Sequence, residues 1–222
     1  MNADPLAIPI AGAEPVSGLL SAPPKARAAL VLAHGAGAGM THSFLASAAE
    51  GLFERGLATL RYQFPYMEKR SSRPDSPKVA HAAVRAAVTE AARLLPGVPL
   101  FAGGKSFGGR MTSQAQAIDP LPGVRGLVFL GFPLHPPGEP SEERAQHLSD
   151  VHIPMLFLQG TRDEFAELTL LQPVCDRLAP RATLKLFEHA NHSFHVPARS
   201  GKKDAAVLAE LLDAAADWMK SL

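Results

Sequence analysis

The chain has 222 residues, 46% of them apolar and 19% charged, so we expect one domain, residues 1–222, that buries about 70% of its unfolded surface. Its 22 Lys and Arg against 21 Asp and Glu leave a formal charge of +1, too small for a nucleic-acid surface, and no nucleic-acid partner is expected. A single cysteine, Cys175, excludes an internal disulfide, and the short apolar runs predict no signal peptide and no membrane partner, so a cytoplasmic protein is expected.

Short apolar runs alternate with helical patterns from residue 28 onward. The Pro-rich and Gly-rich segment before it predicts one or two antiparallel edge strands, such as Val16 to Ser21. Six further strands are predicted at residues 28–33, 57–62, 98–102, 126–131, 155–159 and 183–187. Several are apolar throughout, as strands covered on both faces must be. The pattern predicts an α/β fold with a mostly parallel sheet and helices on both faces.

Three helices stand out in this alternation. Ser76-Pro77 predicts a capped helix start, and Pro96-Gly97 predicts its end. A second helical stretch follows residue 108, and a third runs from Lys202 to the end with an apolar stripe that contains Trp218. We expect this last helix to close the sheet, with Trp218 in the core and Cys175 as another small buried residue.

The strongest local motif is GxSxG, formed by Gly104-Lys105-Ser106-Phe107-Gly108. It lies directly between a predicted strand and a predicted helix, where a sharp turn holds a serine in strained geometry above the sheet. A P-loop ending here needs glycine at Pro99, and a dinucleotide motif starting at Gly35 needs glycine at Met40, so both phosphate-site interpretations fail. The motif predicts Ser106 as a nucleophile, with Lys105 either adding positive potential or exposed.

A serine nucleophile needs a base, and the base needs an orienting acid. Asp163 follows one late strand and His192 follows the next, both at the sheet edge where catalytic groups of open α/β sheets gather. Glu164 and Glu188 remain alternative acids. With His192 as base, kcat/KM should fall as the pH drops through about 6.5. His189, His192 and His195 recur every third position and leave a metal cluster as an alternative, although we expect no metal.

The acyl-transfer transition state also needs backbone NH donors for its oxyanion. The NH of Phe107 is one candidate, because it directly follows the nucleophile. The loop His34-Gly35-Ala36-Gly37-Ala38-Gly39 follows the first parallel strand, and we expect the NH of Ala36 to be the second donor, with Gly35 the neighbouring possibility. His34 is expected to anchor this loop by hydrogen bonding.

The predicted substrate contacts lie in two loops. Gly35, Phe64, Tyr66 and Met67 are the expected binding residues. In the second of these loops, Lys69, Arg70 and Arg73 either bind a carboxylate on the substrate or form an ordinary solvated face, and the solvated face is the favoured interpretation. The segment 132–152 is too short for a large helical cap, so we expect minimal or no cap and an open pocket.

The motifs HGAGAG, GKSFGG, GTRDE and ANHSF together resemble the α/β-hydrolase superfamily over nearly the whole chain. LRYQFPYMEKR with AGGKSFGGRM looks more narrowly like small dienelactone-hydrolase-like proteins, although dienelactone hydrolase itself typically uses cysteine where Ser106 stands. The resemblance implies an α/β-hydrolase fold, a Ser106-Asp163-His192 triad and acyl-enzyme hydrolysis without a cofactor.

These observations predict an enzyme that cleaves a small ester or thioester, with a small acyl compound as its partner. Two alternatives remain. Related sequences include a subunit of a eukaryotic histone-acetyltransferase complex, so a non-catalytic interaction module is one; such modules commonly lose a member of the triad. The other is a metal-dependent hydrolase that uses the histidine cluster, which predicts loss of activity on chelation.

Overall fold

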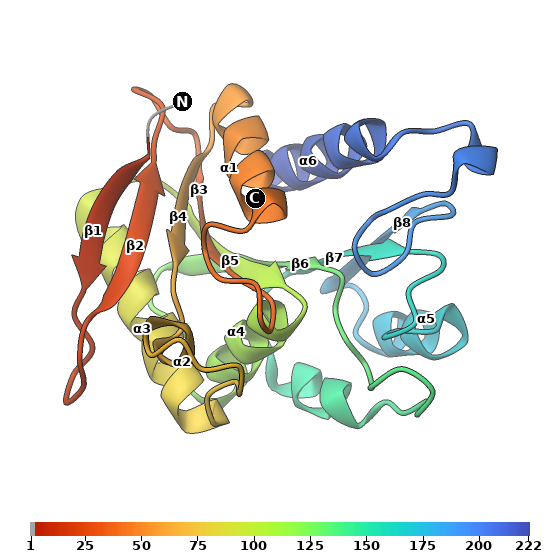
Figure 1. Ribbon diagram of the computed structural model, residues 1–222, viewed down its shortest axis with the longest axis horizontal. Helices are drawn as coiled ribbons and strands as arrows, with labels where there is room; N and C mark the ends of the chain where they lie inside the picture. The colour runs from red at the N-terminus through yellow and green to blue at the C-terminus, as the bar shows by residue number, and fades with distance from the viewer. Residues whose placement is uncertain (1–2) are drawn as a thin grey trace.

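The computed structural model describes residues 3–222 and is built around an eight-stranded sheet (Figure 1). The strands lie in the order β1-β2-β4-β3-β5-β6-β7-β8. Their bounds are β1 Asp4–Ile8, β2 Val16–Ser21, β3 Ala29–Ala33, β4 Ala58–Tyr62, β5 Leu100–Lys105, β6 Val124–Leu130, β7 Met155–Gly160 and β8 Ala182–Phe187. Strands β3 to β8 are paired in parallel, β2 is antiparallel to β4, and β1 is antiparallel to β2. The predicted α/β class and the antiparallel edge are therefore confirmed.

Strand β5 differs most from its predicted bounds, because it continues to Lys105 rather than ending at residue 102. Gly103 and Gly104 pair with Val128 and Phe129 of β6, so the ladder extends through two glycines. Glycine is a poor strand former, which is why the sequence pattern stopped short. The extension carries the strand up to Ser106.

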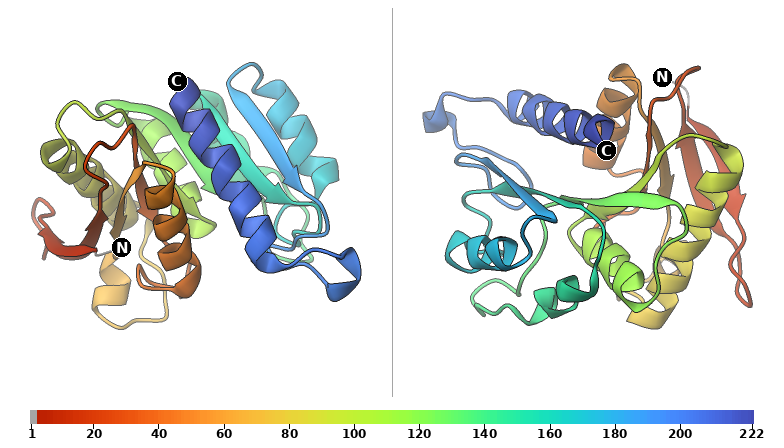
Figure 2. Two further views of the ribbon diagram at one scale, coloured as in Figure 1. Left: turned by 90° about the horizontal axis from the view of Figure 1, so that it is seen from above. Right: turned by 180° about the vertical axis from the view of Figure 1, so that it is seen from behind.

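Helices form a layer on each side of the sheet (Figure 2). Their bounds are α1 Ser43–Glu54, α2 Pro65–Glu68, α3 Pro77–Leu94, α4 Phe107–Ile118, α5 Leu168–Arg177 and α6 Asp204–Ser221, with short 3-10 helices η1 Glu143–Asp150 and η2 Ala198–Ser200. Helices α1 and α6 share one core with the sheet, and α3, α4 and α5 share the other. Parallel strands need this double cover, because both of their faces are apolar.

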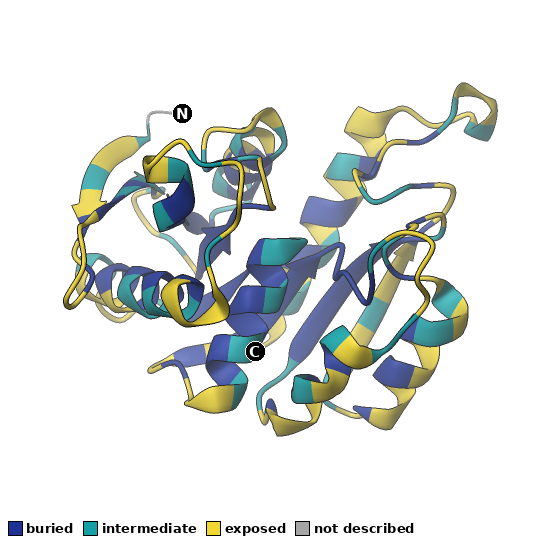
Figure 3. Ribbon diagram, turned by 60° about the horizontal axis from the view of Figure 1, so that its bottom comes forward, coloured by how far each residue is buried: buried dark blue, intermediate teal, exposed yellow. Residues whose placement is uncertain are grey.

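Strand β3 shows how one strand serves both cores. All five of its residues are buried; Val31 points into the core of α3 to α5, whereas Leu30 and Leu32 point into the core of α1 and α6. Each such side chain contributes about 1.5–3 kcal/mol when fully buried. Figure 3 shows the result, with the central strands buried and the outer sides of the helices exposed.

The predicted helices are confirmed at their expected places. Ser76 is the N-cap residue of α3, although its side chain makes no capping hydrogen bond. The helix ends at Leu94, two residues before Pro96. The ring of Trp218 packs edge-on against Phe101 with centroids 5.8 Å apart, and Cys175 is buried.

The connection between β6 and β7 contains only η1, which packs against α4. It is the segment that the sequence predicts to be too short for a large cap. Within residues 3–222, no helix is both long and apolar enough to cross a membrane.

Candidate active site

Ser106 lies at the turn between β5 and α4 with φ 49° and ψ −115°. Positive φ is rare for a residue with a side chain, so the surrounding structure must hold this conformation. The two motif glycines explain how. A Cβ on Gly104 would lie 2.3 Å from the carbonyl oxygen of Ala33, and a Cβ on Gly108 would lie 2.5 Å from that of His34. Only glycine allows β5 and α4 to approach β3 this closely.

A hydrogen-bonded chain links the three predicted catalytic side chains. Nε2 of His192 is 2.8 Å from Oγ of Ser106, and Nδ1 of His192 is 2.7 Å from Oδ2 of Asp163. The carboxylate is acceptor only, so Nδ1 carries the proton and Nε2 presents its lone pair to the serine hydroxyl. The three residues come from the ends of β5, β7 and β8, and this arrangement can accept a proton from Ser106.

Asp163 is held by more than its contact with His192. Its side chain has no exposed surface; Oδ1 accepts the NH of Phe165 at 2.8 Å and Oδ2 accepts Nε2 of Gln159 at 2.5 Å. Gln159 in turn accepts the NH of Phe132. Gln159 was not among the predicted site residues; its signal in the sequence is a polar residue near the end of an apolar strand. The alternative acids Glu164 and Glu188 are not the carboxylates bonded to His192.

His192 is shielded, with 15% of its side chain exposed. Burial is the largest effect and lowers its pKa, the hydrogen bond from Nδ1 to Asp163 opposes the shift, and the charge of Lys105 lowers the pKa further. The ring of Phe165 packs on the imidazole, with centroids 4.3 Å apart and planes at 34°. Phe165 was not among the predicted site residues either, although it lies two residues after Asp163. The net lowering keeps the imidazole neutral, as a base must be.

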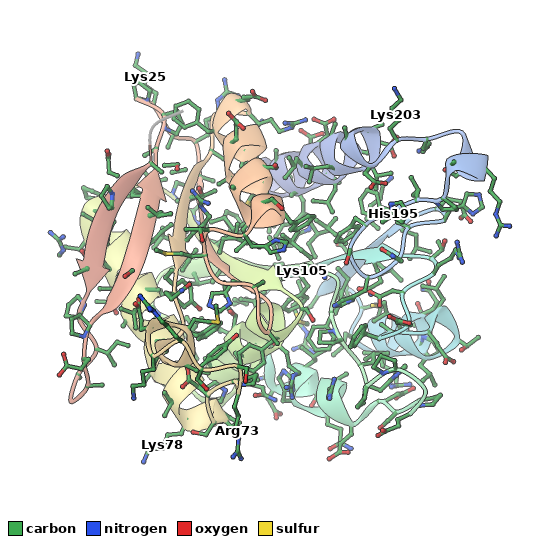
Figure 4. The ribbon with its side chains drawn as sticks, in the orientation of Figure 1. Lys25, Arg73, Lys78, Lys105, His195 and Lys203 are labelled. Carbon is green, nitrogen blue, oxygen red and sulfur yellow. The ribbon has the colours of Figure 1, made fainter. Side chains whose placement is uncertain are left out.

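The amino group of Lys105 is buried, so the interpretation of Lys105 as exposed is wrong. Its Nζ has no hydrogen-bond partner among the described residues and lies 5.7 Å from the centre of the Phe194 ring. Figure 4 shows Lys105 near the centre of the molecule, whereas Arg73 and Lys78 lie at its edge. Burial lowers the pKa of Lys105 to about 8, and the charge of Asp163 partly opposes this shift. Lys105 therefore remains largely a cation at neutral pH.

The three regularly spaced histidines have different partners. His189 faces Glu188 at 3.4 Å, Nδ1 of His195 donates to Oδ2 of Asp204 at 2.8 Å, and only His192 reaches Ser106. Residues 3–222 contain no group of three or more His, Cys, Asp or Glu side chains arranged to hold a metal ion. The three histidines are therefore not arranged as the metal cluster that the sequence left as an alternative.

His34 anchors the glycine-rich loop, as expected. Its Nε2 accepts the NH of Phe64 at 3.0 Å, which puts the proton on Nδ1, and Nδ1 donates to the carbonyl of Gly35 at 2.8 Å. Burial lowers the pKa of His34, which favours this neutral form. Ala36 then lies beside Ser106, and in the described part of the chain the NH groups of Ala36 and Phe107 have no hydrogen-bond acceptor. Both remain free for an oxyanion.

Two cavities meet at Ser106, and Ala36 and Phe165 line both. The cavity on the side of α4 and η1, the arginine cavity, has a volume of about 390 Å³ and is lined by Arg110 and Arg144. The cavity on the side of α1, the histidine cavity, has a volume of about 370 Å³, and its lining includes His192, Phe44 and Leu45. A substrate bound at Ser106 can extend into both.

Gly35 lines the histidine cavity, but Phe64, Tyr66 and Met67 are not among the residues that line either cavity. Phe64 and Tyr66 are buried behind the glycine-rich loop, and the hydroxyl of Tyr66 accepts the NH of Gly37 at 2.9 Å. They support the loop from behind.

Lys69, Arg70 and Arg73 are also absent from the two linings. Their segment carries charge at the surface, which agrees with the solvated interpretation. The arginines beside Ser106 come instead from α4 and η1, outside the loop that the sequence analysis considered.

A second serine and histidine pair lies on the side of the sheet that α4 covers. Oγ of Ser113, in α4, is 2.7 Å from Nε2 of His147, in η1. Ser113 is fully buried and also donates to the carbonyl of Arg110 in its own helix. Burial first, and then the nearby Arg110, lower the pKa of His147 to about 4. The pair joins η1 to α4 and does not line either cavity at Ser106.

Comparison with known proteins places the chain in a family. A family model described as an alpha/beta hydrolase domain matches residues 26–220. The chain belongs to this α/β-hydrolase family. Membership supports a hydrolase activity, and the eight-stranded sheet with Ser106 at its strand-to-helix turn is the corresponding fold.

Solved structures with the same fold agree with this assignment. Dienelactone hydrolase from Anabaena variabilis ATCC 29413 is similar with a TM-score of 0.79 and 20% identity, over 98% of this chain and 96% of that one. An α/β serine hydrolase without lid from Xanthomonas campestris has a TM-score of 0.74 and 20% identity, over 98% and 95%. An esterase domain from Rhodothermus marinus has a TM-score of 0.75 and 13% identity, over 100% and 99%.

Proposed function

We propose that this α/β hydrolase is a serine esterase that cleaves small esters or thioesters through an acyl-enzyme intermediate. The observation that carries the proposal is the chain of hydrogen bonds from Ser106 through His192 to the buried carboxylate of Asp163. Ser106 lies where two cavities meet, so the acyl and alcohol sides of an ester both have space.

In the first half of the reaction, Oγ of Ser106 attacks the carbonyl carbon while Nε2 of His192 takes the hydroxyl proton. Asp163 holds the imidazole in the required tautomer and stabilises its charged form. The negative charge that develops on the carbonyl oxygen is met by the NH groups of Ala36 and Phe107, which act as the oxyanion hole.

Acylation is complete when His192 returns the proton to the leaving oxygen or sulfur and the alcohol or thiol departs. In the second half, water attacks the acyl-enzyme with His192 again as base. His192 then returns that proton to Oγ of Ser106 as the acid is released. These steps use only side chains and backbone groups of this chain, so the proposal needs no cofactor.

Labelling with a fluorophosphonate tests the nucleophile. The protein should label covalently, and Ser106→Ala should abolish labelling and lower kcat for short acyl esters by about a thousandfold or more. Ser113→Ala is the matched control, because it removes the other histidine-bonded serine, and it should leave labelling at Ser106 in place.

A panel of esters with graded acyl length extends the test to the substrate. Hydrolysis should be measured with and without a chelator, and the serine mechanism predicts equal rates. A protein that labels normally as Ser106→Ala, or one that loses activity on chelation, contradicts the proposal.

A further inference from the structure

The arginine cavity carries an excess of positive charge beside the nucleophile. Arg110 lies one helical turn after Ser106, and its NH donates to the Ser106 carbonyl at 3.1 Å. Arg144 reaches the same cavity from η1. The acidic residue in the lining is Asp75, from the loop before α3, and its Oδ2 accepts the NH of Tyr66 at 3.0 Å. The α4 and η1 side of the cavity is therefore cationic.

Neither guanidinium is neutralised within the described residues. Eight ion pairs join other groups, and none of them includes Arg110 or Arg144. Nε of Arg110 is buried and has no hydrogen-bond partner there. A buried donor without an acceptor is costly, and a charged donor more so. The Arg110 side chain lines the cavity and donates no hydrogen bond to the described residues, so an anion in the cavity would be an acceptor for its guanidinium group.

The fold holds these like charges close to each other. The charge of Arg144 adds to burial in lowering the pKa of Arg110. The hydrogen bond between Ser113 and His147 ties η1 to α4, three residues from each arginine. The other titratable groups near this bond are His81, Arg85 and Asp150, and His147 itself is neutral at physiological pH because its pKa is about 4. Bringing two guanidinium groups together without a counter-ion costs energy that a bound anion would recover.

The proton transfers decide which half of an ester lies in each cavity. His192 must give its proton to the leaving oxygen, so the leaving group has to lie on the side of the imidazole. His192 and Ser193 line the histidine cavity and not the arginine cavity. The alcohol therefore occupies the histidine cavity, and the acyl chain extends toward the arginines.

Resting on the proposed esterase function, we infer that the preferred substrates are monoesters or monothioesters of dicarboxylic acids, whose free carboxylate binds Arg110 and Arg144. Guanidinium groups suit this role because they pair with a carboxylate through two parallel hydrogen bonds. The reaction consumes one water: the ester bond breaks as the acyl bond to Oγ of Ser106 forms, and hydrolysis yields the dicarboxylate and the alcohol.

Matched esters test the inference. The butyl hemiesters of succinate, glutarate and adipate should be compared with butyl butanoate, pentanoate and hexanoate, and with 4-(pentanoyloxy)butanoate, which carries its carboxylate on the alcohol side. The best hemiester should exceed its neutral partner in kcat/KM by about tenfold or more, as expected for a charged hydrogen bond. The ester with the anionic alcohol should show no such advantage.

Variants assign the effect to the two arginines. Arg110→Met and Arg144→Met should each lower the ratio of hemiester to neutral-ester kcat/KM by about tenfold. Arg27→Met is the matched control, because Arg27 is exposed and precedes β3 at the opposite end of that strand from Ser106, and this variant should keep the wild-type ratio. Thermal unfolding of each variant verifies that it is folded.

The outcomes separate this inference from the esterase proposal. A wild-type protein that labels with fluorophosphonate but hydrolyses neutral esters as fast as hemiesters overturns the dicarboxylate inference alone. The same holds if folded Arg110→Met keeps the wild-type ratio, or if the anionic alcohol is preferred. A protein that neither labels nor hydrolyses any ester overturns the esterase proposal itself.

Discussion

Two serine and histidine pairs in this molecule have nearly the same distance between Oγ and Nε2, but opposite donors. Ser106 donates to His192, whereas Ser113 donates to the carbonyl of Arg110 and accepts from His147. Oγ lies 2.8 Å from Nε2 in the Ser106 and His192 pair, and 2.7 Å from Nε2 in the Ser113 and His147 pair. The difference lies in the backbone. Ser106 occupies a positive-φ turn at the junction of two cavities, whereas Ser113 is a fully buried residue inside α4. A substrate can reach the first hydroxyl and not the second.

The two histidines also differ at Nδ1, the ring nitrogen that does not face the serine. Nδ1 of His192 donates to Asp163, while among the described residues His147 has no hydrogen bond to a carboxylate. For both histidines burial is the largest cause of a lowered pKa; a carboxylate partner opposes it at His192, and Arg110 reinforces it at His147. A short Ser–His contact therefore does not identify a nucleophile; access, strain and the orienting acid do.

Removing the orienting acid should have the largest effect on this comparison. Asp163→Asn should lower kcat by roughly 10³ to 10⁴, because an amide favours the wrong tautomer of His192. Asp150→Asn, which changes an exposed carboxylate near His147, is the matched control and should stay within about twofold. Steady-state kinetics on one short ester checks both, and a loss of less than about tenfold in folded Asp163→Asn contradicts the assigned role.

The second pair should matter for stability. Ser113→Ala leaves Nε2 of His147 without its partner in a buried site, so the free energy of unfolding should fall by about 1–3 kcal/mol. Urea unfolding measures this change. Ser149→Ala, at an exposed serine of the same 3-10 helix, should change the free energy by less than about 0.5 kcal/mol. Equal effects of the two substitutions would show that the Ser113 bond does not join η1 to α4 as inferred.

The smallest predicted effect is a shift in the pH profile. Because the pKa of His192 is lowered, the acid limb of kcat/KM should have its midpoint below 6.5. Lys105→Met removes a positive charge that opposes protonation of His192, so the midpoint should rise by roughly half a pH unit. Lys25→Met, at an exposed lysine on the edge of the molecule (Figure 4), should leave it in place. A downward shift in Lys105→Met contradicts the electrostatic role.

The sequence by itself determined the features that depend on neighbouring residues. Short, largely apolar runs predicted the six parallel strands, because strands covered on both faces are mainly apolar. Of these six, β8 lies at the edge of the sheet and is mostly exposed. The GxSxG motif predicted the turn at Ser106, because only glycine tolerates the close approach to β3. Ser106, Asp163 and His192 each follow a predicted strand, and the carboxyl ends of parallel strands meet at one edge of the sheet.

Only the tertiary structure decided what depends on the direction of side chains from distant segments. Even spacing of His189, His192 and His195 did not keep them together, because His189 and Phe194 adopt positive φ and the loop follows no regular period. Lys105 is buried where Gly131 and Phe194 come close to the end of β5. Arg110 and Arg144 line one cavity because η1 packs on α4, over 30 residues away along the chain. Whether a side chain is buried or paired with an opposite charge depends on residues that are distant along the chain. A local sequence pattern therefore cannot predict it.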